Sequence, residues 1–187
     1  MSEKLSKSVY QLKVTLKGTK PPIWRRLLVP ADLPLGKLHE VLQLVMGWEN
    51  YHLHQFISGG RFFGMQDGEF SLDAEIEDEN QFKIKDLLSA EKETLGYEYD
   101  FGDSWDHKIV LEKILPAEDG QQPPRCIKGM RACPPEDCGG IWGYQELLET
   151  LSDPKNPDYE EMLEWVGGEF DPELFDIGRV NKQLALV

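Results

Sequence analysis

Apolar and polar residues alternate along two stretches near the start of the chain, a pattern typical of β-strands with one side facing solvent. The first stretch covers residues 10–17 and the second covers residues 23–29. Gly18 to Pro22 interrupt the alternation, so we expect a hairpin with a loop of about five residues. In the second strand the alternation places one of the adjacent arginines, Arg25 or Arg26, among apolar neighbours.

A helical period follows the first hairpin. Residues 35–46 carry apolar side chains at the i, i+3, i+4 and i+7 spacing of an amphipathic helix, and Gly47 is suited to end it. Residues 51–57 then alternate as a strand, with His52 and His54 on one side, and a turn at 59–60 leads into a further short strand. The predicted order is therefore ββαββ, as in a β-grasp unit.

The most polar turn is predicted within GYEYDFGDSWDH, residues 96–107. Residues 97–101 alternate as a half-buried strand, Gly102 permits a turn, and residues 105–112 resume as a second strand. The tip carries several aspartates and His107, more polar chemistry than a tight turn requires. We expect either a ligand or metal site there, or an anchor for cations elsewhere in the chain.

Helical periods return near the end of the sequence, over residues 144–151 and 159–166, and Asp176 is suited to cap a last turn. Together the patterns predict an α+β fold: a mixed β-sheet with a β-grasp-like ββαββ unit plus a long β-hairpin, and C-terminal helices packed on the sheet. We expect a single domain over residues 1–187, with a flexible leader at 1–8, an acidic exposed loop at 67–81 and a long loop at 116–135.

Charge is distributed unevenly along the 187 residues, whose net charge is −14. Residues 1–61 hold nine Lys and Arg against four Asp and Glu, whereas residues 132–178 hold thirteen Asp and Glu against one Lys. The acids are interpreted as solvated helix faces. Because binding to a nucleic-acid backbone requires Lys and Arg side chains that neutralise phosphates, such binding is disfavoured except through the basic N-terminal face.

The sequence also bears on compartment. No apolar run approaches the ~20 residues that span a bilayer, and the start lacks the apolar core of a signal peptide, so no membrane partner is expected. Three cysteines, an odd number, suit a reducing compartment. Cytoplasmic localisation is the prediction.

Two groups of residues have metal-ligand chemistry. Cys126, Cys133 and Cys138 could bind zinc together with a histidine, although buried small side chains, a Cys133–Cys138 disulfide or a reactive thiol are alternatives. His52 and His54, with His107 or a hairpin aspartate, could instead form a set of two histidines and one carboxylate. Histidines on an aromatic-rich face can equally hydrogen-bond a buried carboxylate or carbonyl.

The adjacent arginines and the hairpin aspartates could also meet. Arginine matches a carboxylate with two parallel hydrogen bonds and tolerates burial only when paired. We therefore predict that Arg25 or Arg26 contacts Asp100, Asp103 or Asp106. The contact would be a structural tie, or alternatively an arginine would bind an anionic ligand beside Trp24 and Trp48.

Four longer blocks carry a resemblance to a known family: PPIWRRLLVP, LHEVLQLVMGWENYHLHQF, YEYDFGDSWDHKIVLE and CPPEDCGGIWGY. From about Tyr10 to Asn181 the chain resembles the plasmid ORF-three-like family, first named from a root-inducing plasmid. The resemblance implies an α+β domain found in bacteria and archaea, often on mobile elements and without an established activity. The family blocks fall on Trp24, Arg25, Arg26, His39, Trp48, His52, His54, Tyr99, Asp100, Gly102, Asp103, Trp105, His107, Cys133, Cys138 and Gly140.

Some members of that family carry the label of an insertion-element passenger protein or a TnpR-type recombinase. A serine resolvase requires a nucleophilic serine among basic residues and a DNA-reading helix-turn-helix. Neither pattern occurs in this sequence, where Ser104 lies among aspartates.

The leading functional hypothesis is an intracellular binding or interaction module associated with mobile elements, more a binder than an enzyme. Its ligand, an unidentified small molecule or protein, would occupy a polar pocket at the YDFGDSWDH hairpin. The alternatives are a metal-dependent hydrolytic enzyme, with zinc as the cofactor considered, and an accessory protein of DNA recombination or transposition. Ligand-binding candidates are Trp24, Arg25, Arg26, Trp48, Tyr99, Asp100, Asp103 and Trp105, and metal candidates are His52, His54, His107, Cys126, Cys133 and Cys138.

Overall fold

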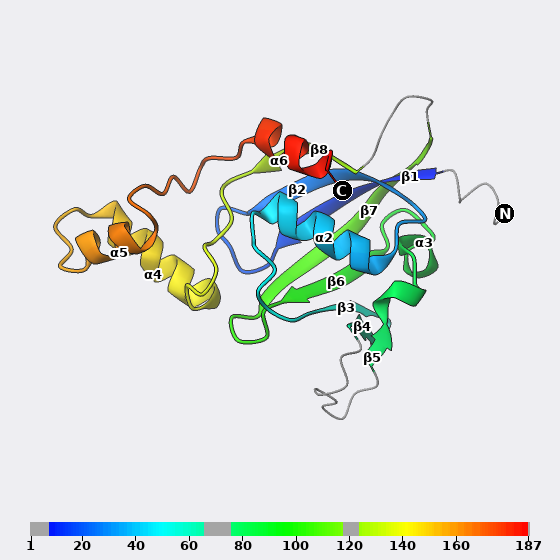
Figure 1. The fold of residues 1–187 in the computed structure, drawn as a ribbon, viewed down its shortest axis with the longest axis horizontal. Helices are drawn as coiled ribbons and strands as arrows, with labels where there is room; N and C mark the ends of the chain where they lie inside the picture. The colour runs from blue at the N-terminus through cyan, green and yellow to red at the C-terminus, as the bar shows by residue number, and fades with distance from the viewer. Residues whose placement is uncertain (1–7, 66–75, 118–123, 187) are drawn as a thin grey trace.

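A computed structural model describes residues 8–65, 76–117 and 124–186, and its eight strands form one mixed sheet (Figure 1). The strands are β1 (Ser8–Leu16), β2 (Trp24–Pro30), β3 (His54–Ser58), β4 (Arg61–Gly64), β5 (Ile76–Asp78), β6 (Thr94–Tyr99), β7 (Trp105–Pro116) and β8 (Arg125–Met130). The helices are α2 (Leu35–Met46), the 3-10 turn η1 (Glu79–Gln81), α3 (Ile84–Leu87), α4 (Gly140–Ser152), α5 (Tyr159–Trp165) and α6 (Ile177–Leu184).

The strand order is β5-β4-β3-β6-β7-β1-β2-β8, and the predicted mixed α+β class is confirmed. The first five elements follow the predicted ββαββ order. The long hairpin β6–β7 lies between the two flanking hairpins, because β6 pairs with β3 and β7 pairs with β1. This central place brings the turn of the hairpin close to the segment that precedes β3.

One face of the sheet carries the core. In β1, Tyr10, Leu12, Val14 and Leu16 are buried, while the residues between them are partly exposed. Helix α2 covers the buried face, and Gly47 ends it with φ 92°, donating its N–H to the carbonyl of Gln43. The expectation of a strand with one wet side is met, and so is the buried arginine, since Arg25 is almost completely enclosed.

The C-terminal helices divide into two groups (Figure 1). Helix α6 packs on β8 and α2, whereas α4 and α5 pack on each other and lie beyond one end of the sheet. Helix α5 fully buries none of its residues, so its position depends on α4. None of the helices in the described ranges combines the length and apolar composition needed to cross a bilayer.

Two predicted loops contain regular structure. Within the acidic stretch 67–81, residues 76–78 form β5 beside β4 and residues 79–81 form η1, with Glu79 buried; residues 66–75 lie outside the described part. Within 116–135, residues 125–130 form β8, paired with β2 across the register from Trp24–Met130 to Leu28–Arg125. The leader expected at residues 1–8 falls outside the described residues apart from Ser8, which begins β1.

Candidate functional site

The turn between β6 and β7 is held in one conformation by Asp100. Asp100 adopts a left-handed φ of 57°, its N–H donates to the carbonyl of Leu53 at 2.8 Å, and its carbonyl accepts from the N–H of Ser104 at 2.6 Å. Its Oδ1 accepts from the N–H of Gly102 at 2.9 Å and more weakly from that of Asp103 at 3.4 Å. Oδ1 is therefore engaged in the turn, and Oδ2 remains to face the neighbouring segment.

A second turn, residues 136–139, docks onto this hairpin tip. Asp103 accepts the N–H of Gly139 at 3.1 Å through Oδ2. The approach is close enough that a Cβ on Gly140 would lie 2.6 Å from the carbonyl oxygen of Asp103, and both glycines have positive φ. The CGG sequence thus allows the start of α4 to rest on the hairpin.

Tyr99 fixes the same turn from the other side. Its hydroxyl donates a short hydrogen bond to Glu136 and accepts the backbone N–H of Tyr51 at 3.1 Å. Burial and the Glu136 carboxylate both raise the pKa of Tyr99 above its ordinary value, so the phenol keeps its proton. The segment before β3, the hairpin tip and the 136–139 turn consequently meet at one place.

His52, Asp100 and Asp137 converge at that place, and we call them the His52–Asp100–Asp137 cluster. His52 Nε2 lies 3.1 Å from Asp137 Oδ1 and 3.7 Å from Asp100 Oδ2. Among the described residues this is the one group of three His, Cys, Asp or Glu whose ligand atoms all lie within 4.8 Å of one another. The Asp137 side chain is 69% exposed and that of His52 28%, so the cluster opens to solvent.

The imidazole nitrogen in this cluster is unusual. His52 Nε2 is buried as an atom and makes no hydrogen bond to any described residue, although it lies 3.1 Å from Asp137 Oδ1. One imidazole nitrogen and two carboxylates are a ligand set suited to divalent metals such as zinc, manganese and iron. Among the described residues, the geometry brings together the donors that such an ion would need.

The other histidines lie in the core. His54 begins β3 and contacts Glu79 at 2.7 Å, with both side chains buried. Its ring stacks on that of His39 at 3.4 Å between centroids, and His39 also contacts Tyr97 and Asn50. The expected pairing of His52 with His54 as a metal clamp is wrong, because β3 begins only at His54 and the two side chains reach different partners.

His107 is completely buried, and neither ring nitrogen has a hydrogen-bond partner among the described residues. Its ring meets Trp48 edge-on at 5.4 Å and lies 5.3 Å from Tyr97. Burial lowers the pKa of His107 to about 4, which keeps the imidazole neutral. It does not share a three-ligand group with His52 in the described structure.

The predicted contact between the arginines and the hairpin aspartates is wrong. Arg25 donates to three backbone carbonyls, those of Val45, Trp24 and Met130, and its guanidinium lies 4.0 Å from the ring centroid of Phe175. Arg26 makes two parallel hydrogen bonds to Glu112, at 2.6 and 2.8 Å. Burial of an arginine required partners, as expected, but the partners are carbonyls and a glutamate of β7.

The aromatic ligand-binding candidates do not all lie together. Trp48 and Tyr99 stack at 4.9 Å. Trp48 donates its indole N–H to the carbonyl of Pro134 at 3.0 Å, just before the 136–139 turn, and Tyr99 contacts the turn itself through Glu136. Trp105 is fully buried 5.9 Å from Trp48, with its indole N–H unpartnered among the described residues. Trp24 lies instead beside the cations of Lys13 and Arg26.

All three cysteines are free. Burial raises the pKa of the Cys126 and Cys133 thiols and raises that of Cys138 to about 12. None of them joins a three-ligand group within the described residues, so the geometry does not assemble the predicted cysteine set.

Two acidic residues at the site, Glu136 and Asp137, are not among the residues that the sequence predicts to bind a ligand. Asp137 lies within the block CPPEDCGGIWGY, in which the cysteines are the residues predicted to bind a metal. A signal was present in the two glycines after Cys138, which indicate a close approach of the backbone to another segment.

Comparison with known proteins places the chain beside a family and two relatives without an assigned function. The model of the family described as plasmid pRiA4b ORF-3-like protein matches residues 8–179. The uncharacterized protein y4hQ of Sinorhizobium fredii is 40% identical over 176 residues, which are 94% of this chain and 90% of that protein. A crystal structure of a protein of unknown function from Methanosarcina mazei has a TM-score of 0.83 and 40% identity, covering 92% of this chain and 96% of the other.

Proposed function

We propose that this chain, which belongs to the plasmid pRiA4b ORF-3-like family, is a binding module that takes a divalent metal cation at the His52–Asp100–Asp137 cluster. The observation that supports a cation most directly is the buried Nε2 of His52, which lacks a hydrogen bond and faces two carboxylates. An association with mobile elements and a cytoplasmic location are the expectations that accompany this function.

Electrostatics favours a cation over an anion at this place. Asp100 and Asp137 approach the same nitrogen, and Asp103 and Glu136 come from the two turns that form the site. Among the described residues no arginine or lysine pairs with Asp100 or Asp137. A divalent ion would offset the repulsion between the carboxylates and would satisfy the imidazole nitrogen.

The three residues would hold the ion with unequal rigidity. Asp100 is fixed through its own turn, and its Oδ2 needs no rearrangement to face His52. Asp137 lies on an exposed turn and can adjust its distance to ions of different radius. Three protein ligands leave further coordination positions open to solvent or to a second ligand.

Calorimetric titration of metal-free protein with Mn²⁺ and, separately, with Zn²⁺ tests this function. We expect one ion per chain, and a loss of affinity of about tenfold or more in Asp137→Asn and in Asp100→Asn, because each removes one charged ligand. Asparagine keeps an acceptor for the N–H of Gly102, so Asp100→Asn preserves the turn.

The matched control is Asp106→Asn, which lies on the same hairpin but pairs with Lys17 at 3.4 Å. This variant should bind as the unchanged protein does. Equal affinity in Asp137→Asn, Asp106→Asn and the unchanged protein, or no binding of either ion, would overturn the proposal.

A metal-dependent hydrolase is the second candidate, supported by the open side of the cluster at Asp137. A metal bound by three protein ligands can polarise a water in the remaining position. Hydrolysis of p-nitrophenyl esters that depends on both the ion and Asp137 would establish it, whereas ion binding without turnover leaves the binding module. Action as a DNA accessory protein stays a prediction.

A further inference from the structure

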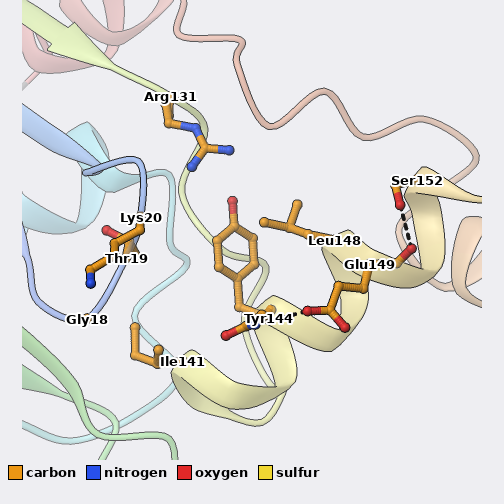
Figure 2. Close-up of a pocket in the computed structure, with 10 residues that line it drawn as sticks. Gly18, Thr19, Lys20, Arg131, Ile141, Tyr144, Leu148, Glu149 and Ser152 are labelled. Carbon is orange, nitrogen blue, oxygen red and sulfur yellow. Dashed lines mark hydrogen bonds between the residues drawn. The ribbon is translucent and has the colours of Figure 1, made fainter.

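A pocket of about 560 Å³ lies apart from the cluster, between α4, the turn joining β1 to β2, and the segment after β8 (Figure 2). Its volume is in the range of small-molecule sites. Residues from three distant parts of the sequence line it, chiefly Lys20, Arg131, Ile141, Tyr144, Leu148 and Glu149. The turn is seated directly on α4, since a Cβ on Gly18 would lie 3.2 Å from Ile141.

Tyr144 supplies an unsatisfied donor to this pocket. Its side chain projects from α4 into the space between Lys20, Arg131 and Leu148 (Figure 2). The residue is 3% exposed, and its hydroxyl is buried without a hydrogen-bond partner among the described residues. Burial raises the pKa of Tyr144 to about 12, so the hydroxyl is protonated and can donate. Because a buried hydroxyl without a partner costs free energy, a ligand acceptor there would be favoured.

Arg131 provides positive charge at the same place. It is 5% exposed, donates from Nε to Glu173 at 2.8 Å and from Nη1 to the carbonyl of Pro21 at 3.1 Å. Its Nη2 has no hydrogen bond to a described residue. Figure 2 shows the guanidinium directed toward the space that the Tyr144 hydroxyl faces, and Lys20 also lines the pocket.

Aliphatic side chains line the pocket beside these polar groups. Ile141 and Leu148 provide aliphatic surface beside the ring of Tyr144 (Figure 2). Glu149 is engaged with the amide of Gln145 at 2.9 Å on its own helix. The donors of Arg131 and Tyr144 suit a ligand acceptor, and the aliphatic side chains suit an apolar group.

We propose that this pocket binds a small organic anion, a carboxylate or phosphate monoester with an apolar group, whose anionic end contacts Arg131 and Tyr144. The apolar group lies against Ile141 and Leu148. Charge-assisted hydrogen bonds from guanidinium and hydroxyl give such a ligand its orientation.

The first experiment compares ligands of one shape and different charge. Benzoate, phenyl phosphate and benzyl alcohol are titrated into the full chain, and methyl NMR signals of Ile141 and Leu148 report occupancy. We expect one or both anions to bind and the neutral alcohol to bind at least about tenfold more weakly. The ratio of the two anion affinities identifies the carboxylate or the phosphate as the preferred head group.

The second experiment uses variants that shift affinity in opposite directions. Tyr144→Phe removes one donor and should weaken the preferred anion about tenfold. Glu173→Gln should tighten it, because the carboxylate that offsets Arg131 is lost, and the 66% exposed Glu173 tolerates this change. Glu169→Gln and Tyr159→Phe, which change residues outside the pocket lining, should leave affinity within about twofold.

The proposal fails if the alcohol binds as well as the anions, or if neither anion shifts the methyl signals at millimolar concentration. It also fails if Tyr144→Phe and Tyr159→Phe behave alike. Urea unfolding of each variant separates loss of the pocket from loss of the fold. Because no residue of the His52–Asp100–Asp137 cluster lines this pocket, the anion-binding test can fail or succeed independently of the cation-binding test.

Discussion

At the scale of single residues, His39 and His107 are imidazoles enclosed by the core. Burial is the main cause that lowers the pKa of His39 to about 3 and that of His107 to about 4. His107 has no hydrogen-bond partner among the described residues, whereas His39 contacts Tyr97 and Asn50. Both rings are neutral in the folded protein at pH values where exposed histidines in an unfolded chain already bind a proton.

Stability should therefore fall with acidification. The unfolded chain binds protons near pH 6.5, the ordinary histidine value, while the folded chain does so only near pH 4 and below. The contribution is fully present above pH 6.5 and is lost as the pH falls through this window, at about 1.4 kcal/mol per pH unit for each histidine. Urea unfolding between pH 7 and about pH 5 measures the slope.

His107→Phe removes one of these two protons from the balance. The slope of unfolding free energy against pH should become shallower by about half, whatever the change in absolute stability. A slope that remains equal to that of the unchanged protein would show that His107 does not contribute.

At the scale of elements, the first turn of α4 and the 136–139 turn form one packed unit. A Cβ on Gly143 would lie 1.8 Å from the carbonyl oxygen of Cys138, too close for any side chain without backbone movement. The same turn carries Asp137 and hydrogen-bonds to Asp103 through Gly139. The packing of one helix thus determines where a cluster residue lies.

Gly143→Ala should accordingly lower stability by about 1–3 kcal/mol and weaken Mn²⁺ binding, because the turn must move to admit the methyl group. Gln145→Ala changes an exposed residue of the same helix and should leave both quantities nearly unchanged. Thermal unfolding and calorimetric titration of the two variants provide the comparison. Unaltered ion affinity in Gly143→Ala would separate the helix packing from the cluster.

Some of the helices and strands can be predicted from the local sequence pattern, and others cannot. The helix at 35–46 and the long hairpin follow from periodicity, because both bury one regular side against the core. Strand β8 was hidden in a stretch rich in proline and glycine, where pairing to β2 rather than local pattern makes the strand. Glu79 belongs to the stretch 67–81, for which the sequence predicts an exposed loop, since nothing local indicates that His54 is its partner.

The candidate site was foreseen only in part. The hairpin tip at Asp100 and the nearby His52 do meet, as the accumulation of polar residues suggested. Asp137 is 37 residues further along the chain than Asp100, and its arrival depends on tertiary packing around Gly140. The partners of the arginines could not be predicted from the local sequence, because the strand register places Arg26 beside Glu112 of β7.

At the scale of the whole molecule, α4 and α5 lie beyond the end of the sheet (Figure 1), and their part of the sequence is rich in Asp and Glu. Helix α5 alone carries Glu160, Glu161 and Glu164 in seven residues, and Lys155 is the single cation in residues 132–178. Like charges one helical turn apart repel one another at low salt. Electrostatic repulsion therefore opposes folding of this part.

Moderate salt should stabilise the protein. Raising the NaCl concentration from about 0.01 M to about 0.15 M shortens the screening length from about 30 Å to about 8 Å, and we expect the unfolding temperature to rise by about 2 °C. Glu164→Gln removes one member of an i, i+4 acidic pair and should reduce this rise. Calorimetric scans at several salt concentrations measure both, and an unfolding temperature that falls with salt would contradict the expectation.

The turn that presents Asp137 is also the chain's entry into the helix pair α4 and α5. A ligand bound by His52, Asp100 and Asp137 together would therefore hold this helix pair in a fixed position relative to the β6–β7 hairpin. If the bound ligand raised the affinity of these helices for a macromolecule by some factor, that macromolecule would raise the affinity of the cluster for the ligand by the same factor. The 136–139 turn would in this way couple ligand binding at the cluster to macromolecular recognition by α4 and α5.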